Sequence, residues 1–323
     1  MSGFDATLQI LLVALAIDAV IGDPRWLWQR IPHPVVVMGK AIAALDRRLN
    51  REDQPGAVRR SAGIATVLIL VGASVLLGYV LEQLLEQVIG GWFVSALLAS
   101  VLIAQRSLYD HVAAVRDALR DGGLEAGRKA VSMIVGRDPA SLDISGVSRA
   151  AIESCAENFS DGIVAPAFWF ALLGWPGLLV YKMVNTADSM IGHRTARHEQ
   201  FGWAAARLDD LLNLVPARFS AVLVAFVAPV VGGSIAQSAR VAWRDAGVHR
   251  SPNAGWPESA MAGALGIALA GPRRYPERIV DDPFLNADGR HDANADDIGR
   301  ALRVYMLACV LQAALYAALV VCL

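Results

Sequence analysis

Residues 61–81, SAGIATVLILVGASVLLGYVL, run for 21 positions without a charged side chain and decide the class of fold. A helix needs about 20 mostly apolar residues to cross the hydrocarbon core of a bilayer, so this stretch is long enough to span it. Four further uncharged stretches are of similar length: Gln87–Gln105, Gly162–Tyr181, Phe219–Ala239 and Val304–Leu323. The sequence therefore predicts an all-α, polytopic membrane protein.

The composition of the chain agrees with this prediction. Hydrophobic residues make up 55% of the 323 positions and charged residues 18%, against roughly 45–50% and about 25% in an average soluble domain. The net charge of −1 and the lack of a dense basic run give no reason to expect a nucleic-acid partner. Three cysteines without CxxC or metal-ligand spacing argue against a disulfide framework.

The N-terminal apolar stretch, residues 6–21, contains one charged residue, Asp18. No basic segment precedes it, and Gly-Asp-Pro follows it in place of a small-x-small cleavage site. We expect this stretch to be retained as a helix and not removed as a signal peptide.

The basic residues indicate the orientation in the membrane. All 29 lysines and arginines fall within residues 23–60, 106–161, 182–218 and 240–303. Residues 82–86 and both termini hold none. Because positive loops face the cytoplasm, these four segments are predicted to be cytoplasmic.

Two apolar stretches, residues 162–181 and 219–239, would then each begin and end on the cytoplasmic side. Both carry helix-breaking residues, among them Pro176 in the first and Pro229 with Gly232 in the second. We expect four complete spans and two re-entrant or broken helical segments, with cytoplasmic helical loops and both termini outside. Six complete spans with one basic loop translocated is the alternative.

Acidic side chains before and after the first broken segment suggest a cation site. Glu153, Glu157 and Asp161 are spaced i, i+4, i+8, which predicts one acidic stripe on a helix. Like charges at this spacing repel, so a cation partner is a natural explanation. A solvated helix face is the alternative for any one of these acids.

A second polar group follows the first broken segment. Asn185 and Asp188 lie one turn apart, and Asp209, Asp210 and Asn213 come after them. Such hard oxygen ligands suit Mg²⁺ that carries substrate phosphates. The nearby cations could meet phosphate oxygens; they are Lys182, Arg194, Arg207 and Arg218.

Two turn-rich loops could hold further polar groups in fixed positions. Gly22-Asp-Pro24 and Pro32-His-Pro34 place Asp23 and His33 near the first helix. Residues 249–258, HRSPNAGWPE, combine two prolines and a glycine with several hydrogen-bonding side chains. A purely structural turn is the alternative for each loop.

Six segments, taken in order, resemble the adenosylcobinamide-phosphate synthase family of cobalamin biosynthesis, and together they extend over nearly the whole chain. These segments are Asp18–Gly39, Gly136–Asp138, Glu153–Pro166 (ESCAENFSDGIVAP), Tyr181–Gly192 (YKMVNTADSMIG), Phe201–Arg218 and Ser251–Gly263 (SPNAGWPESAMAG). The stretch after Gly271 matches no motif that we can assign. One catalytic domain, residues 1–323 with a polar core at about 130–260, is expected.

The resemblance implies an ATP-driven ligase that needs Mg²⁺. It would join a propionate of adenosylcobyric acid to (R)-1-amino-2-propanol or its phosphate, at the inner membrane of a bacterium with the active site facing the cytoplasm. Lipid surrounds such a protein, and a complex with other membrane enzymes of the pathway is plausible only by analogy. No glycine-rich P-loop marks an ATP site.

Together with the polar motifs, the resemblance implies a role for each candidate residue. Catalytic roles are expected for Lys182, His33, Glu258 and Asp23. Substrate or nucleotide binding is expected for Arg137, Asp138, Asn158, Asn185, Arg207, Asn213, Arg218, Ser251 and Asn253. Metal binding is expected among Glu153, Glu157, Asp161, Asp188, Asp209 and Asp210.

Two other functions are open alternatives. Broken apolar segments bracketed by Asp, Asn and Lys are typical of substrate sites in secondary transporters, although the chain shows no internal repeat. A non-catalytic membrane sensor is the other alternative. The acidic set and the loop at residues 249–258 favour an enzyme.

Overall fold

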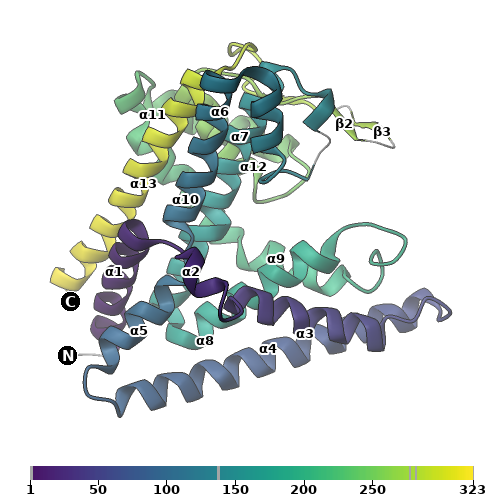
Figure 1. The fold of residues 1–323 in the computed structure, drawn as a ribbon, viewed down its shortest axis with the longest axis vertical. Coiled ribbons are helices and arrows are strands. Elements are labelled where there is room, and N and C mark those ends of the chain that lie inside the picture. The colour runs from purple at the N-terminus through teal and green to yellow at the C-terminus, as the bar shows by residue number, and fades with distance from the viewer. Residues whose placement is uncertain (1–2, 137–138, 276–277, 281, 323) are drawn as a thin grey trace. The chain divides into compact units, whose positions relative to one another are not determined.

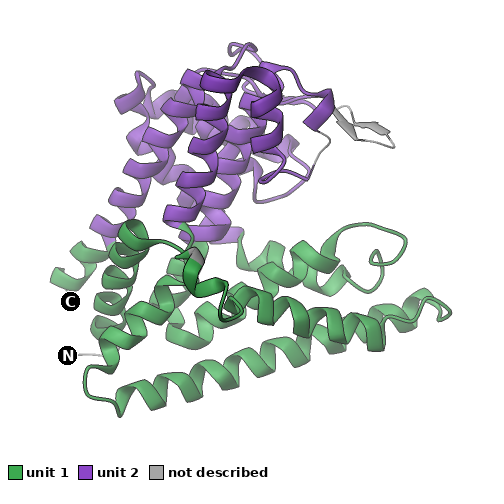
Figure 2. Cartoon of the chain, viewed as in Figure 1, with its two compact units in different colours: residues 1–104, 165–213, 316–323 green, residues 105–164, 214–315 purple. Residues whose placement is uncertain are grey.

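The computed structural model describes residues 3–136, 139–275, 278–280 and 282–322 (Figure 1). The chain divides into two compact units, coloured separately in Figure 2. Unit 1 contains residues 1–104, 165–213 and 316–323, and unit 2 contains residues 105–164 and 214–315. Each unit is thus assembled from segments that are distant in sequence. The expectation of one catalytic domain stays a prediction.

Unit 1 is built from helices whose apolar residues pack together. Its elements are α1 (Gly3–Ile21), α2 (Arg25–Trp28), α3 (Pro34–Leu49), α4 (Gly56–Glu86), α5 (Gly91–Ser100), α8 (Ala165–Ala187), the π-helical turn η3 (Asp188–Gly192) and α9 (Trp203–Leu212). The long helix α4 packs along α8, and both contact α9. Pro34 begins α3 at a position where its missing N–H costs nothing.

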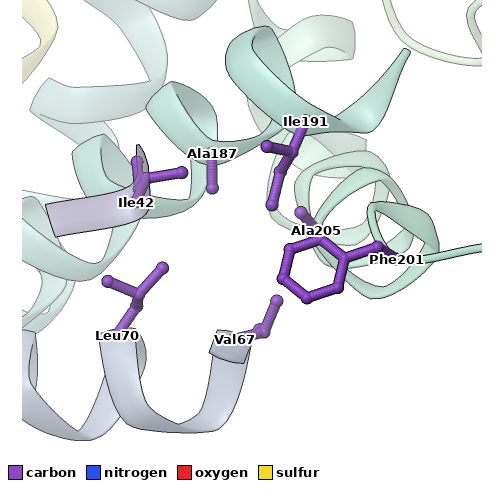
Figure 3. Close-up of a cluster of buried hydrophobic side chains, with 7 residues drawn as sticks. All are labelled: Ile42, Val67, Leu70, Ala187, Ile191, Phe201 and Ala205. Atoms are coloured by element: carbon purple, nitrogen blue, oxygen red, sulfur yellow. The ribbon is translucent and has the colours of Figure 1, made fainter. Parts of the chain in front are cut away.

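Seven buried side chains join these helices where the polar residues of α8 and α9 lie. Figure 3 shows this cluster, contributed by α3, α4, α8, η3, α9 and the loop before α9: Ile42, Val67, Leu70, Ala187, Ile191, Phe201 and Ala205. Ala187 and Ile191 flank Asp188, and Ala205 lies one turn before Asp209 on α9. The apolar cluster therefore fixes the two backbone segments that carry these carboxylates.

Unit 2 contains the other helices, and all of the strands, that the described residues form. Its helices are α6 (Gln105–Val131), η1 (Pro139–Ser141), α7 (Ile144–Phe159), the π-helical turn η2 (Ser160–Val164), α10 (Leu214–Val227), η4 (Ala228–Val231), α11 (Ile235–Asp245), η5 (Ala246–Val248), α12 (Gly255–Leu265) and most of α13 (Ala295–Cys322). Helices α10, α11 and α12 pack against one another, and α6 packs on α7.

Within the described residues, six helical segments are long and apolar enough to cross a membrane, which confirms the class of helical, multi-pass membrane protein. They are Phe4–Ile21, Gly56–Glu86, Gly91–Val131, Ile144–Gly192, Leu214–Val231 and Ala295–Cys322. How many of them cross completely stays a prediction.

The helices break at residues that the sequence marks. Gly174 has φ 61° and ψ −146° inside α8, a conformation that glycine adopts readily, and Pro176 follows two residues later. Gly232 is left-handed and ends η4, after which the chain turns into α11. These interruptions agree with the expectation of two broken helical segments.

Four short strands lie in the stretch that no sequence motif explains. β1 (Leu269–Ala270) pairs antiparallel with β4 (Phe284–Leu285), and β2 (Arg273–Tyr275) pairs antiparallel with β3 (Arg278–Val280). The sequence pattern predicts no strand here, and these short pairs leave the all-α class of the fold unchanged. Strands of two or three residues are too short for an alternating pattern to be recognised.

Candidate functional site

The most connected polar residues of unit 1 surround Asp209 on α9. The Asn185 side-chain amide on α8 donates to Oδ1 of Asp209 at 3.3 Å, and the Asn213 amide donates to Oδ2 at 3.0 Å. The Tyr181 hydroxyl in turn donates to Oδ1 of Asn213 at 2.9 Å. Asp209, Asn213 and Tyr181 are buried. One continuous network therefore fixes both oxygens of the Asp209 carboxyl.

Two further carboxylates lie near this network. Asp188 begins η3, and Asp210 accepts a hydrogen bond from Arg207 at 3.4 Å. Burial, followed by the negative charge of Asp188, raises the pKa of Asp209 to about 7, although the amide hydrogen bonds lower it. Burial also raises the pKa of Asp210 against the opposing charge of Arg207. We call Asp188, Asp209 and Asp210 the carboxylate cluster.

The carboxylate cluster concentrates negative charge that a cation would neutralise. Within the described parts of the chain, no three His, Cys, Asp or Glu side chains are arranged to hold a metal ion by themselves. Both oxygens of Asp209 already accept amide hydrogen bonds. The cluster thus fits Mg²⁺ delivered with phosphates, which needs only one or two carboxylates plus water. The six-residue metal set stays a prediction.

Lys182 is buried on α8, three residues before Asn185 and therefore on the same side of the helix. Its side chain is 9% exposed, which is rare for a lysine unless a partner compensates its charge. Its expected role in phosphate binding stays a prediction.

The structure brings the predicted pair Asp23 and His33 together. His33 Nε2 lies 3.6 Å from Asp23 Oδ1, and the His33 ring packs edge-on against Trp28. His33 Nδ1 accepts the backbone N–H of Val35 at 3.2 Å and caps α3. The ring therefore has a fixed orientation, with Nε2 directed at the carboxylate.

In unit 2 the three acids of the predicted stripe differ in burial and in local helix geometry. Glu153 is buried, and its Oε1 accepts the backbone N–H of Ala270 at 2.9 Å. Glu157 is exposed, and Asp161 lies in η2 because the helix changes from α to π geometry after Phe159. The three acids therefore have three different environments. Their metal binding stays a prediction.

Asn158, on the same helix, turns back onto α7. Its side-chain amide donates to the Ser154 carbonyl at 2.9 Å and to the Ser154 hydroxyl at 3.2 Å. Asn158 is exposed, and its amide is tied to the helix that carries it.

The turn at residues 249–258 also orders polar groups in unit 2. His249 Nε2 lies 3.7 Å from Oε1 of buried Glu258. The Ser251 hydroxyl accepts the backbone N–H of Asn253 at 3.3 Å and thereby closes the turn. These contacts give Glu258 a histidine partner that the sequence did not identify.

Arg218 lies against the same turn. Its guanidinium is 4.7 Å from the centre of the Trp256 ring, and its Nη1 contacts Oδ1 of buried Asn253 at 3.5 Å. The predicted binding residues Arg218, Ser251 and Asn253 are thus neighbours. Arg137 and Asp138 lie outside the described residues.

A partly buried ionic network in unit 1 was not predicted from the sequence. Arg197 contacts Oδ2 of Asp46 through Nε at 3.2 Å and Nη2 at 2.9 Å. Asn50 donates to the other oxygen of Asp46 at 2.8 Å, and Arg59 donates to Asn50 and to the Arg197 carbonyl. The hydrogen bonds of Asn50 and Arg197 hold the pKa of Asp46 below its usual value, although burial alone would raise it. We call these four residues the Asp46 network.

The Asp46 network acts on the loop that joins the carboxylates. Arg197 lies between Asp188 in η3 and Asp209 on α9. Its pairing with α3 therefore anchors the connection between two of the three members of the carboxylate cluster. Asp46 and Arg197 are separated by 151 positions, so no sequence spacing could have indicated the pair.

These features define a helical, multi-pass membrane protein with a hydrogen-bonded carboxylate cluster beside its apolar helices. The model of the CobD/Cbib protein family matches residues 11–305. The chain belongs to this family.

Several relatives of the chain carry the same name. It is 57% identical to the cobalamin biosynthesis protein CobD of Sinorhizobium fredii (strain NBRC 101917 / NGR234) over 315 residues, 96% of both chains. The proteins of the same name from Rhizobium meliloti (strain 1021) and Rhodobacter capsulatus are 52% and 47% identical, with 96% and 92% of each chain covered. No solved structure matches the chain significantly.

Proposed function

We propose that the chain is an ATP-dependent, amide-forming ligase of cobalamin biosynthesis. It joins the propionate carboxylate of adenosylcobyric acid to (R)-1-amino-2-propanol or its O-phosphate and gives adenosylcobinamide or its phosphate. The observation that carries the proposal is the family match over residues 11–305, which extends over the six motifs that resemble these synthases. The fixed carboxylate cluster supports it further.

The chemistry explains why ATP is needed. A carboxylate is a poor acyl donor because its leaving group would be oxide. In the proposed reaction a propionate oxygen attacks the γ-phosphorus of ATP, ADP leaves, and an acyl phosphate forms. The neutral amine then attacks the acyl carbon, phosphate leaves, and the amine proton passes to a base.

The residues of unit 1 suit the phosphate part of this reaction. Asp188 and Asp210 would hold Mg²⁺, which neutralises charge on the triphosphate when it is bound. Asp209, held by Asn185 and Asn213, keeps the position of α9 relative to α8. Lys182 would stabilise negative charge that develops on the transferred phosphoryl group.

Two histidine–carboxylate pairs are candidates for the base. His33 has its Nε2 directed at Asp23, and Glu258 has His249 at 3.7 Å. Because Nδ1 of each ring accepts a backbone N–H, from Val35 or Ser251, the carboxylate of each pair is the group that would take the proton from the ammonium form of the substrate. In unit 2, Arg218, Ser251 and Asn253 would bind substrate oxygens.

We place the protein in the inner membrane of a bacterium with the site facing the cytoplasm, since the basic segments include the motifs. Membrane lipid and the corrinoid substrate are then its immediate partners. A complex with other membrane enzymes of the pathway is a further proposal by analogy.

The test is amide formation by the purified, detergent-solubilised protein. It receives adenosylcobyric acid, Mg²⁺-ATP and either aminopropanol or its phosphate, and the corrinoid is analysed by mass spectrometry. An ATP-dependent mass gain of one amine is expected and identifies the true amine. Folded protein that binds the corrinoid but gives no gain with either amine would contradict the proposal and favour a carrier.

Substitutions of the carboxylates separate a ligase from the transporter and sensor alternatives. Asp209→Asn combined with Asp210→Asn should abolish amide formation while the protein remains folded in detergent. A non-catalytic sensor should tolerate these changes. Asp110→Asn, an exposed carboxylate of α6 outside the cluster, is the matched control and should keep full activity.

A further inference from the structure

A pocket of about 340 Å³ opens on unit 2, between α6 and the first turns of α13. Four arginines and one acid are among its lining residues: Arg116, Arg120, Arg300, Arg303 and Asp296. Such a concentration of guanidinium groups favours an anion, and guanidinium geometry matches phosphate well. No step of the proposed ligase reaction uses this pocket.

Two of these arginines are available to a ligand. Arg303 is exposed and has no ion-pair or hydrogen-bond partner among the residues that the structure describes. Arg120 pairs with Asp296 at 2.5 Å, but the Asp296 side chain is 81% exposed. Exposed ion pairs are weak, so a phosphate can displace Asp296 from Arg120.

The other two arginines form the fixed wall of the pocket. Arg116 bonds Asp117 at 2.7 Å, and Arg300 bonds Asp297 at 3.1 Å and the Val231 carbonyl at 3.0 Å. Their guanidinium groups are held in place and contribute positive charge without having to move.

The position of the pocket indicates a lipid. Arg303 is the last charged residue of α13, and an uncharged stretch through Leu323 follows it. Met306 and Val310 are 42% and 63% exposed and lie one turn apart on one side of α13, so an exposed apolar strip leads away from the pocket. A free phosphate would use only the arginines, whereas a phospholipid would use both the arginines and the strip.

We propose that this pocket binds the headgroup phosphate of an anionic phospholipid, with an acyl chain along Met306 and Val310. Basic pockets at the cytoplasmic end of membrane helices recognise such headgroups through arginine and lysine. The site is independent of the proposed ligase activity, and its test requires no turnover.

Native mass spectrometry of the full-length protein in detergent tests the proposal, with phosphatidylglycerol and phosphatidylcholine as probes. The natural chain should bind phosphatidylglycerol preferentially. Each arginine near an anionic lipid contributes roughly fivefold in affinity, so Arg120→Gln combined with Arg303→Gln should weaken binding roughly 25-fold. Arg240→Gln is the control, because Arg240 is exposed on α11 of the same unit and outside the pocket.

A variant that is expected to bind the lipid more tightly controls for loss of binding through misfolding. Asp296→Asn removes the competing acid and should tighten phosphatidylglycerol binding. Equal binding by the double variant and the natural chain, or equal weakening by Arg240→Gln, would overturn the proposal. Displacement of the lipid by an equal concentration of inorganic phosphate would also overturn it and assign the pocket to a free phosphate.

Discussion

Burial and the neighbouring Asp188 carboxylate raise the pKa of Asp209 to near neutral pH, although two amide donors lower it. The pKa is about 7 in the folded chain, against an ordinary value of 3.8. Because the folded state binds the proton more strongly, this group favours folding most at a pH below about 4. Its contribution is lost as the pH rises through about 7.

The first prediction follows from this titration. Without Mg²⁺, the melting temperature of the natural chain should fall between pH 4 and pH 7 more steeply than that of Asp209→Asn, in which the group cannot ionise. The free-energy difference over this range is on the order of 4 kcal/mol. Added Mg²⁺ should reduce the slope of the natural chain. Identical slopes in both proteins would show that Asp209 keeps an ordinary pKa.

The contribution of Asp46 to stability depends on pH in the opposite direction, and the second prediction concerns this residue. Its pKa is lowered in the folded chain, so its contribution is present above its ordinary value of 3.8 and is lost as the pH falls through the folded pKa. Asp46→Asn leaves Arg197 with a weaker acceptor and should lower the free energy of unfolding by about 1–3 kcal/mol at pH 7.

Urea unfolding monitored at pH 7 checks this second prediction. Glu52→Gln is the matched control, since Glu52 contacts the same guanidinium at 2.7 Å but is 65% exposed. Its loss should cost less than about 1 kcal/mol. A cost as large for Glu52→Gln as for Asp46→Asn would contradict the special role of the buried carboxylate.

At the scale of elements, the turn from α8 through η3 to α9 depends on two glycines with different neighbours. A Cβ on Gly192 would lie 1.9 Å from Oδ1 of Asp188, the movable end of a side chain. A Cβ on Gly202 would lie 1.6 Å from the backbone oxygen of Ile191. The first contact can be relieved by a rotation of Asp188, whereas the second requires the backbone to move.

The third prediction uses this contrast. Gly192→Ala should displace the Asp188 carboxylate and lower the rate of amide formation roughly 100-fold, with little change in melting temperature. Gly202→Ala should instead destabilise the fold, by about 1–3 kcal/mol or more. Activity assays and thermal unfolding of both variants check this. Equal loss of stability in the two variants would show that Gly192 is needed for the fold as much as Gly202, and would contradict this prediction.

The sequence predicts the elements of this region better than their contacts. The uncharged stretches indicate the long helices because a span requires a fixed minimum of apolar length. The breaks at Gly174 and Gly232 are also visible, since glycine and proline interrupt helices whatever surrounds them. The change to π geometry after Phe159, which places Asp161 in η2, has no such local signal.

The candidate site also has a part that the sequence predicts and a part that it does not. Asn185, Asp209 and Asn213 were predicted as one polar set, and they are hydrogen-bonded to one another, because two short motifs carry them. The Asp46 network depends instead on residues 151 positions apart, whose meeting is decided by the tertiary fold alone. Local spacing therefore identifies residues on one helix or turn, but not the distant partners that fix them.

At the scale of the whole molecule, the distribution of charge predicts the orientation in the membrane. The basic segments would all face the cytoplasm, and the loop after α4, which has none, would face outside. The segments at residues 162–181 and 219–239 must then return to the side from which they start. Their breaks at Gly174 and Gly232 make this possible.

The fourth prediction tests this orientation by single-cysteine labelling. In a variant without Cys155, Cys309 and Cys322, one cysteine at a time replaces an exposed residue: Glu52, Glu86, Asp121, Glu199 or Asp288. In intact cells a membrane-impermeant maleimide should label only Glu86→Cys, because the other four positions face the cytoplasm. All five should react after the cells are broken, which controls for accessibility.

Labelling of Glu199→Cys in intact cells would contradict this prediction. The segment at residues 162–181 would then cross the membrane completely, and the arrangement of six full spans would hold. That result would also move the carboxylate cluster to the outer side, away from cytoplasmic ATP, because Glu199 lies between Asp188 and Asp209 in the sequence. The labelling of this one position therefore tests the topology and the proposed use of ATP together.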